Sequence, residues 1–251
     1  AAAHQQLASY DAAAALKLLA RPTRLPTRVE RQQAMSTLAG MASPSVDNIM
    51  LDAINRLYFP EQVPADMRLD IQLAASSRKS QQVQSALKFY RQSRRGPLGA
   101  MIDCLEGGDI ERGREIFLYR TEVSCVRCHK AVGRGGDVGP PLDRIGADKD
   151  LKYLLEAVLL PNAAIAKGFQ SVSLIDHDGR VLSGVVRSEN DTTIELISAE
   201  GRRLTIPKDQ VDVRKEAKSP MPEDLAKRLS TSDIRDLVAF LASLKAAPQQ
   251  P

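Results

Sequence analysis

The hydrophobic pattern of the chain changes twice, and this change limits its fold more than any other feature. Up to about residue 160, apolar residues recur at three- and four-residue spacing, which is typical of amphipathic helices. From Phe169 to Val213 they alternate with polar residues, which predicts short antiparallel strands. Helical spacing returns at 232–245. We therefore expect a mainly α fold that carries a small antiparallel β insertion at about residues 169–214.

The first hundred residues are expected to form a helical domain. Prolines separate five amphipathic stretches and suit the turns and first positions of helices. Short helices in direct succession favour a HEAT-like stack over residues 1–100, although no exact repeat of residues is present. No catalytic constellation occurs here, and His4 lies at a terminus that we expect to fray. The predicted helices are 5–20, 27–41, 44–58, 63–77 and 79–95.

Composition and charge exclude several classes of protein. The chain has 251 residues, of which 43% are hydrophobic, so it can bury a core. It lacks Trp and lacks any run of the roughly 18 apolar residues that a membrane-spanning helix needs, so neither an aromatic nucleic-acid platform nor a membrane span is expected. Residues 1–100 carry a net charge of +6 and the remainder −2. The positive charges are scattered, so they suit solvated helix faces, or an acidic protein partner, better than nucleic acid.

Residues 101–251 are predicted to form a second domain with a more varied pattern. Asp109 suits the N-cap of a helix that leads into a cysteine-rich segment, and a further helix is expected at 148–160. The chain begins with Ala and shows no signal segment, so we expect a processed chain or a piece of a longer one. The predicted strands are 169–176, 180–187, 192–198 and 202–206, with a fifth short strand through 211–213.

The strongest motif is Cys125-Val126-Arg127-Cys128-His129. The spacing C-x-x-C-H places two thiols where they can add to the two vinyl groups of a haem, with the adjacent His as an axial ligand to the iron. Covalent attachment also suits a chain with only 4% aromatic residues, because fewer ring contacts are needed to hold the cofactor. One covalent haem c is therefore the predicted cofactor.

Three other interpretations of this motif compete. A zinc site wants a fourth ligand at metal spacing, and no second C-x-x-C or H-x-x-x-H exists in the chain. A thioredoxin-type pair wants a strand before the motif and a helix after it, whereas here a predicted helix precedes it and a glycine-rich loop follows. A structural disulfide would leave His129 without a role.

The second axial ligand is predicted to be Met221. The ligand should be soft and lie on a loop next to the final helix, and Met221 stands between Pro220 and Pro222 in such a place. Met101 precedes the motif by too few residues to cross the haem face easily. The other methionines fall on helical stripes and are expected to fill core space; they are Met35, Met41, Met50 and Met67.

Other residues near the motif have weaker assignments. Tyr153, Leu154 and Leu159 are expected to wall the haem, from their position on the helix after the loop. Cys104 lies on an apolar stretch and is expected to be an unreactive buried thiol. His177 stands in a predicted turn, where a solvated side chain is the simplest expectation.

Two resemblances sharpen the prediction. Gly139-Pro140 and Leu142 resemble the loop of small c-type cytochromes, which implies that the Pro140 carbonyl orients His129. Over about residues 105–245 the chain also resembles the haem-binding domain of planctomycete and verrucomicrobial proteins. The quoted matches besides C-x-x-C-H are Gly113 to Phe117, Gly135 to Leu142, Tyr153 to Glu156, Pro161-Asn162, 178–180, Ser219 to Pro222 and Asp236 to Leu241.

This resemblance implies HEAT-like helices before the haem domain and, in many members, a dehydrogenase propeller further upstream. We therefore expect a single-haem c-type cytochrome that carries one electron between a periplasmic dehydrogenase and an acceptor, on the outer side of the cytoplasmic membrane. A haem-based sensor or interaction scaffold with a labile Met221 is the alternative. An enzyme is the less favoured expectation, since a peroxidase would need a distal acid or base that the sequence does not show.

Overall fold

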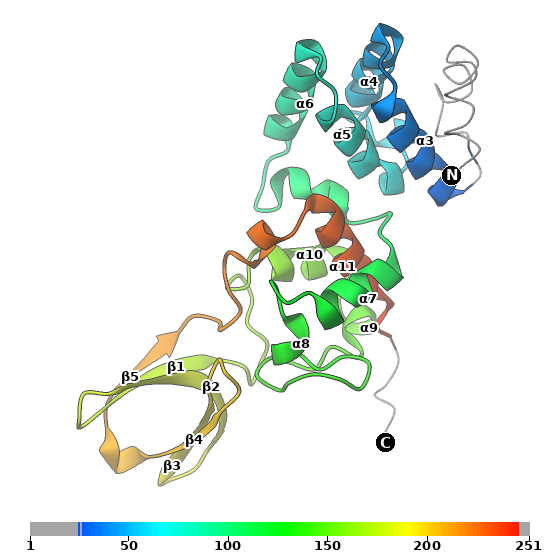
Figure 1. Ribbon diagram of the computed structural model, residues 1–251. Coiled ribbons are helices and arrows are strands. Elements are labelled where there is room, and N and C mark those ends of the chain that lie inside the picture. The colour runs from blue at the N-terminus through cyan, green and yellow to red at the C-terminus, as the bar shows by residue number, and fades with distance from the viewer. Residues whose placement is uncertain (1–24, 26, 246–251) are drawn as a thin grey trace. The chain divides into compact units, whose positions relative to one another are not determined.

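The computed structural model describes residue 25 and residues 27–245 (Figure 1). The chain divides into two compact units, Ala1–Gly108 and Asp109–Pro251, called unit 1 and unit 2 below. The division expected from sequence lay between residues 100 and 101. The predicted helix 5–20 and His4 lie outside the described residues.

The described part of unit 1 is helical, and local caps explain where its helices begin. Thr27 and Glu30 form a capping box before the first of them, and the hydroxyl of Ser43 caps a helix whose first residue is Pro44. Ser80 accepts a hydrogen bond from the amide of Val83 in the same way. The predicted helices 27–41, 44–58 and 79–95 are confirmed. The elements are α3 (Arg28–Gly40), α4 (Pro44–Arg56), η2 (Pro60–Gln62), η3 (Ala65–Met67), α5 (Arg68–Ser76), α6 (Gln81–Ser93) and η4 (Gly99–Cys104).

These helices share one apolar core. α5 packs against α3, α4 and α6, and the core residues come from all four helices. Met35, Met50 and Met67 are fully buried in it, which confirms their predicted role as core fillers. Whether the stack is HEAT-like stays a prediction.

A buried polar cluster joins η4 to the helices of unit 1. The carboxylate of Asp103 accepts hydrogen bonds from Gln72 Nε2 (2.8 Å) and from the hydroxyl of Tyr90 (2.7 Å). Burial, assisted by the hydrogen bond to Asp103, raises the pKa of Tyr90 above its usual range. Because Asp103 is tied to α5 and α6 in this way, unit 1 extends beyond residue 100.

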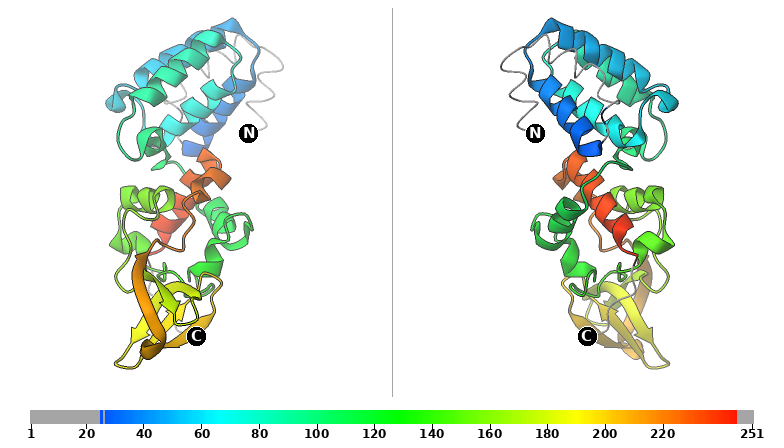
Figure 2. Two further views of the ribbon diagram at one scale, coloured as in Figure 1. Left: turned by 90° about the vertical axis from the view of Figure 1, so that its left-hand side faces the viewer. Right: turned by 90° about the vertical axis from the view of Figure 1, so that its right-hand side faces the viewer.

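The helices of unit 2 surround the C-terminal helix. α11, red in Figure 2, lies between α7 and α10 and also contacts α9. Phe117 of α7 and Phe240 of α11 are buried with ring centroids 5.5 Å apart, and their helices approach closely at Gly113. Along residues 27–245, no helix has the length and apolar character needed to cross a membrane. The helical elements are α7 (Ile110–Tyr119), α8 (Cys125–Cys128), α9 (Ile145–Asp148), α10 (Leu151–Leu159), η6 (Leu225–Arg228) and α11 (Thr231–Ser243).

A five-stranded antiparallel sheet interrupts these helices between α10 and η6. Its strand order is β4-β3-β2-β1-β5, so consecutive strands pair except where β5 returns to pair with β1. One face buries a core made by Val172, Leu174, Ile194, Leu196 and Ile206. The alternating pattern thus correctly predicted strands with one buried face. The strands are β1 (Ser171–Asp176), β2 (Val181–Glu189), β3 (Thr193–Ile197), β4 (Arg203–Pro207) and β5 (Val211–Ala217); η5 (Lys208–Gln210) joins the last two.

The predicted fold class was wrong. About 49% of the described residues are helical and 15% are in strands, so the protein is a mixture of helix and sheet and not a mainly α cytochrome c fold. The physical reason lies in the sheet: all five strands join in one sheet with its own buried core. The sheet is thus a main structural part of unit 2, and not the small insertion in a helical domain that the sequence pattern predicts.

His177 ties the turn between β1 and β2 to the edge strand β5 and to η5, and this predicts a pH effect. Nδ1 lies 2.7 Å from a carboxylate oxygen of Asp212 and Nε2 lies 2.7 Å from the carbonyl oxygen of Asp209. Both partners accept only, so the doubly protonated ring satisfies both, and the hydrogen bond to Asp212 is the main cause that raises the pKa of His177 above 6.5. The stabilising contribution of His177 is therefore complete below pH 6.5 and is lost as the pH rises through the folded-state pKa.

An NMR titration of the His177 ring checks this prediction. We expect a midpoint above 6.5 in the wild type and a lower one in Asp212→Asn, which keeps the shape of the side chain but removes its charge. A wild-type midpoint at or below 6.5 would contradict the arrangement. His177 is exposed, as predicted, but it has two fixed partners that the sequence did not indicate.

Candidate functional site

The C-x-x-C-H segment forms a single helical turn after α7. α8 spans Cys125–Cys128, and His129 ends it with its amide donating to the carbonyl of Cys125 (3.0 Å). Cys125 and Cys128 are free thiols and both are half-buried. Two thiols and an imidazole are thus presented within five consecutive residues.

Both thiols are held in the protonated form at neutral pH. Burial raises the pKa of Cys125 to about 11 and also raises the pKa of Cys128, which the nearby Arg127 partly offsets. A thioredoxin-type nucleophile needs the opposite shift, because its thiolate is the reactive form. The segment also follows a helix and not a strand. The site therefore does not have the features of a dithiol redox centre.

The ring of His129 is fixed by the carbonyl of Pro140, as the resemblance to small cytochromes implied. His129 Nδ1 lies 2.9 Å from the carbonyl oxygen of Pro140. Since a carbonyl only accepts, Nδ1 carries the proton and donates it, which leaves the lone pair on Nε2. In the described part of the chain, Nε2 has no hydrogen-bond partner. Burial lowers the pKa of His129, against the opposing effect of the bond to Pro140, so the ring is neutral at pH 7 and its Nε2 can act as a ligand.

The glycine-rich loop wraps closely around this segment. The amides of Gly136 and Gly139 donate to the carbonyls of Val126 (2.9 Å) and Cys128 (2.8 Å). Gly139 lies flat against the imidazole: a Cβ placed there would be 2.4 Å from His129 Cε1 and 2.7 Å from Nδ1. Only a residue without a side chain allows this approach. The loop therefore forms a cradle that sets the position of the ring.

Backbone strain is concentrated at the two ends of the segment. Among the described residues, the two non-glycine residues with left-handed φ are Ser124 (45°) and Val132 (48°). For a β-branched residue such as Val132 this conformation is unusual, and each such residue costs about 1–3 kcal/mol. Strain of this kind persists where surrounding contacts force it and is commonest at functional sites.

The sheet packs on the cradle, which the sequence did not predict. Val138 of the loop forms a buried cluster with Val185 of β2 and Ile197 of β3. Cys128 and Phe169 pack against this cluster, so one of the two thiols lies beside the sheet. Val185 and Ile197 alternate along their strands with the residues of the sheet's own core, so they lie on its opposite face. Alternation predicted one buried face and gave no sign that the loop covers part of the other.

Met221 lies on the loop between β5 and η6 and is half-buried. Its amide donates to the hydroxyl of Ser219 (3.2 Å), and the amide of Ser219 donates to Asn162 Oδ1 (2.9 Å). In the described chain, the hydrogen bonds of this loop run to Asn162, not to the C-x-x-C-H segment. Of the six methionines, Met221 is the only one whose residue number falls in unit 2.

The remaining predicted site residues lie on α10, which packs against α11 and η6. Leu154 is buried, while Tyr153 and Leu159 are half-buried. The ammonium of Lys149 lies 4.5 Å from the centre of the Tyr153 ring. Cys104 is buried in unit 1, as expected for an unreactive thiol.

The chain was compared with known families and with curated proteins. No family model matches it. No curated protein matches it either. The haem prediction therefore depends on the geometry of Cys125, Cys128, His129 and Pro140.

Zinc fits this geometry less well. Among residues 27–245, no three His, Cys, Asp or Glu side chains gather in a group that could hold a metal ion. A zinc site built on the C-x-x-C-H segment would need four such donors.

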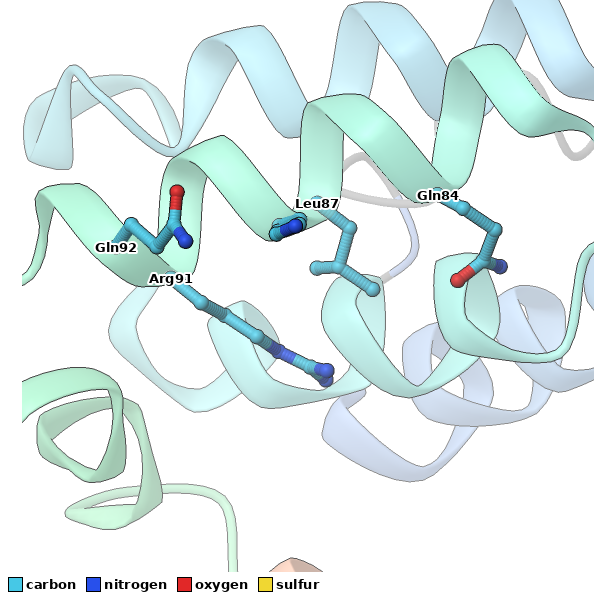
Figure 3. A pocket seen from close by; sticks show the side chains of 5 residues that line it. Gln84, Leu87, Arg91 and Gln92 are labelled. Atoms are coloured by element: carbon cyan, nitrogen blue, oxygen red, sulfur yellow. The ribbon is translucent and has the colours of Figure 1, made fainter.

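Unit 1 contains a hollow of about 310 Å³ along α6. Figure 3 shows Leu87 and Arg91 among the side chains that line it, and Arg91 Nε donates to Gln72 (3.1 Å). The lining residues are Gln84, Leu87, Lys88, Arg91 and Gln92. Two of these side chains are basic and two are amides, and no carboxylate, histidine or cysteine is among them.

Proposed function

We propose that the protein is a single-haem c-type cytochrome that transfers one electron. The observation that carries the proposal is the state of His129: Pro140 holds its Nδ1–H, its Nε2 lone pair is free, and two free thiols lie within one helical turn. This donor set is the one that covalent haem attachment requires. Once bound, the haem supplies an iron that changes between the ferric and ferrous states.

Each residue of the site has a distinct task in this proposal. Cys125 and Cys128 form the two thioether bonds, and their protonated thiols need no counter-charge in a half-buried site. His129 would hold the iron through Nε2, and the hydrogen bond from Nδ1 to Pro140 would strengthen its donor character. Met221 would hold the iron through its sulfur, and a thioether ligand would favour the ferrous state and raise the potential.

Two packing features around the segment support this proposal. Gly139 lies close against the imidazole, and the hydrogen bond from Nδ1 to Pro140 fixes the ring orientation. On the other side, Cys128 packs against the cluster of Val138 with Val185 of β2 and Ile197 of β3. The surroundings of Cys128 are therefore partly apolar, which would suit a thioether bond at this position.

Partners and location follow from the same proposal. A protein dehydrogenase would donate the electron and a cytochrome or oxidase would accept it, outside the cytoplasm, where c-type haem is attached. Membership of the planctomycete and verrucomicrobial haem-binding family is part of this proposal. It is supported by the residues that resemble that family, of which Gly113, Phe117 and Phe240 meet in the helix crossing of unit 2.

Visible spectra of the protein made with a haem-attachment system test the proposal. We expect one covalent haem per chain, sharp low-spin bands after reduction, and a weak far-red sulfur-to-iron band in the oxidised form. Met221→Ala should abolish the far-red band and allow carbon monoxide to bind the ferrous protein, because a coordination position opens. Met101→Ala is the matched control and should leave the spectrum unchanged, since Met101 belongs to unit 1.

Two outcomes would contradict parts of this proposal. A chain that takes up no covalent haem, although its two cysteines are intact, would overturn the whole of it. High-spin wild-type bands that Met221→Ala does not alter would remove Met221 as a ligand. Carbon monoxide binding by the wild type would then favour the sensor.

A further inference from the structure

One side chain holds the Met221 loop from both sides. Asn162 follows Pro161 directly after α10 (Leu151–Leu159). Its Oδ1 accepts from the amide of Ser219 (2.9 Å), and its Nδ2 donates to Glu223 Oε1 (2.7 Å). The two anchored residues stand two positions before and two positions after Met221. Asn162 therefore brackets the predicted ligand.

The segment between these anchors has little freedom of its own. Pro220 and Pro222 fix φ on either side of Met221. The amide of Met221 donates to Ser219 Oγ (3.2 Å), so the backbone at Met221 is tied to a residue that Asn162 holds. A shift of Asn162 would therefore be transmitted to Met221 through Ser219.

The two hydrogen bonds of Asn162, to Ser219 and to Glu223, require an amide side chain. The Ser219 amide needs an acceptor and the Glu223 carboxylate needs a donor, so only one orientation of the Asn162 amide satisfies both. Aspartate would place a second carboxylate against Glu223, and an apolar side chain would lose both bonds. Asn162 is also half-buried and stands three residues after the end of α10, whose Leu154, Leu155 and Val158 are buried, so its backbone starts from a packed helix.

We propose that Asn162 is the positioning residue that sets where the sulfur of Met221 lies. The inference rests on the proposed function, because it assigns Asn162 a task only if Met221 is an axial ligand. Asn162 itself touches neither iron nor sulfur in this proposal. It acts through the backbone of Ser219 and through Glu223.

Asn162→Ala tests the proposal with two independent measurements. In the purified, haem-loaded full chain, hydrogen exchange at the amides of Ser219 and Met221 should become about five- to tenfold faster, the effect of losing one net hydrogen bond or slightly more. The far-red sulfur-to-iron band should weaken, and carbon monoxide should bind the ferrous protein faster than in the wild type. The amount of covalent haem should not change, since Cys125 and Cys128 are untouched.

Lys218→Ala is the matched control on the same loop. It removes an exposed ion pair to Glu223, with the Lys218 side chain 77% exposed, and leaves both bonds of Asn162 in place. Exposed pairs of this kind contribute little, so exchange and spectrum should stay close to the wild type.

The outcomes separate this proposal from the proposed function. If Met221→Ala leaves the spectrum unchanged, Met221 is not a ligand and the ligation itself fails, whatever Asn162→Ala does. If Met221→Ala removes the far-red band but Asn162→Ala alters neither the band nor the exchange of Ser219 and Met221, the positioning role is overturned. Faster exchange together with a weakened band supports it.

Discussion

Gly139→Ala is expected to abolish the ordered His129 site. The added methyl group would lie 2.4 Å from Cε1 and 2.7 Å from Nδ1 of the ring, so either the ring or the loop must move. Movement of the ring breaks the hydrogen bond to Pro140, and movement of the loop breaks the bond from the Gly139 amide to Cys128. Overpacking of this kind costs about 1–3 kcal/mol. We expect a large fall in the yield of low-spin, haem-loaded protein.

Gly133→Ala is the control for this prediction. Gly133 belongs to the same loop, and a Cβ there would meet no heavy atom within 4 Å, although its φ of 75° is left-handed. Its cost is that of the backbone alone, about 1 kcal/mol. The measurement is covalent haem per chain together with the fraction of low-spin signal. Equal losses in the two variants would show that the contact with the ring is unimportant.

Phe117→Ala is expected to destabilise unit 2 by about 3–5 kcal/mol, the usual cost of removing a buried aromatic side chain. Phe117 is 2% exposed and packs against Phe240 at the crossing of α7 and α11. Removing the Phe117 ring would leave a cavity between α7 and α11. The C-x-x-C-H segment follows α7 directly and would lose part of its support. Urea unfolding followed by circular dichroism gives the change in the free energy of unfolding.

Phe89→Ala provides the comparison. Phe89 lies on α6 and is 67% exposed, so its removal should change the free energy of unfolding by no more than about 0.5 kcal/mol. A Phe117→Ala variant as stable as Phe89→Ala would show that the helix crossing does not depend on the aromatic pair.

Local chemistry was readable from the sequence, and contacts between distant segments were not. Asp109 was expected to be the N-cap of the next helix, and its carboxylate accepts a hydrogen bond from the amide of Arg112 within the first turn. The contact between His129 and the carbonyl of Pro140 was expected from the resemblance to the loop of small c-type cytochromes, and the structure contains it. Alternation predicted where the strands lie, but it did not predict that all five join in one sheet with its own buried core. That is why the mainly α prediction was wrong.

The parts that were missed depend on pairs of residues far apart in the chain. Asn162 was noted only beside Pro161, because nothing near it in sequence shows that Ser219 and Glu223 are its partners. The burial of Val138 by the sheet is another contact between distant segments, because its partners Phe169, Val185 and Ile197 lie more than 30 residues further along the chain. Such contacts depend on how the sheet returns to the helices, which local propensity does not encode.

The hydrogen bond between Asn162 and Ser219 also joins the two ends of the segment that contains the sheet. The two residues are 57 positions apart, and all five strands lie between them. The entropy of closing such a loop grows only with the logarithm of its length, so doubling the excursion adds about 0.6 kcal/mol. Longer strands or extra hairpins in this segment would therefore add little to the free energy needed to bring Asn162 and Ser219 together. The packing of Val185 and Ile197 on Val138 sets the limit, since it requires β2 and β3 to keep their register near the loop.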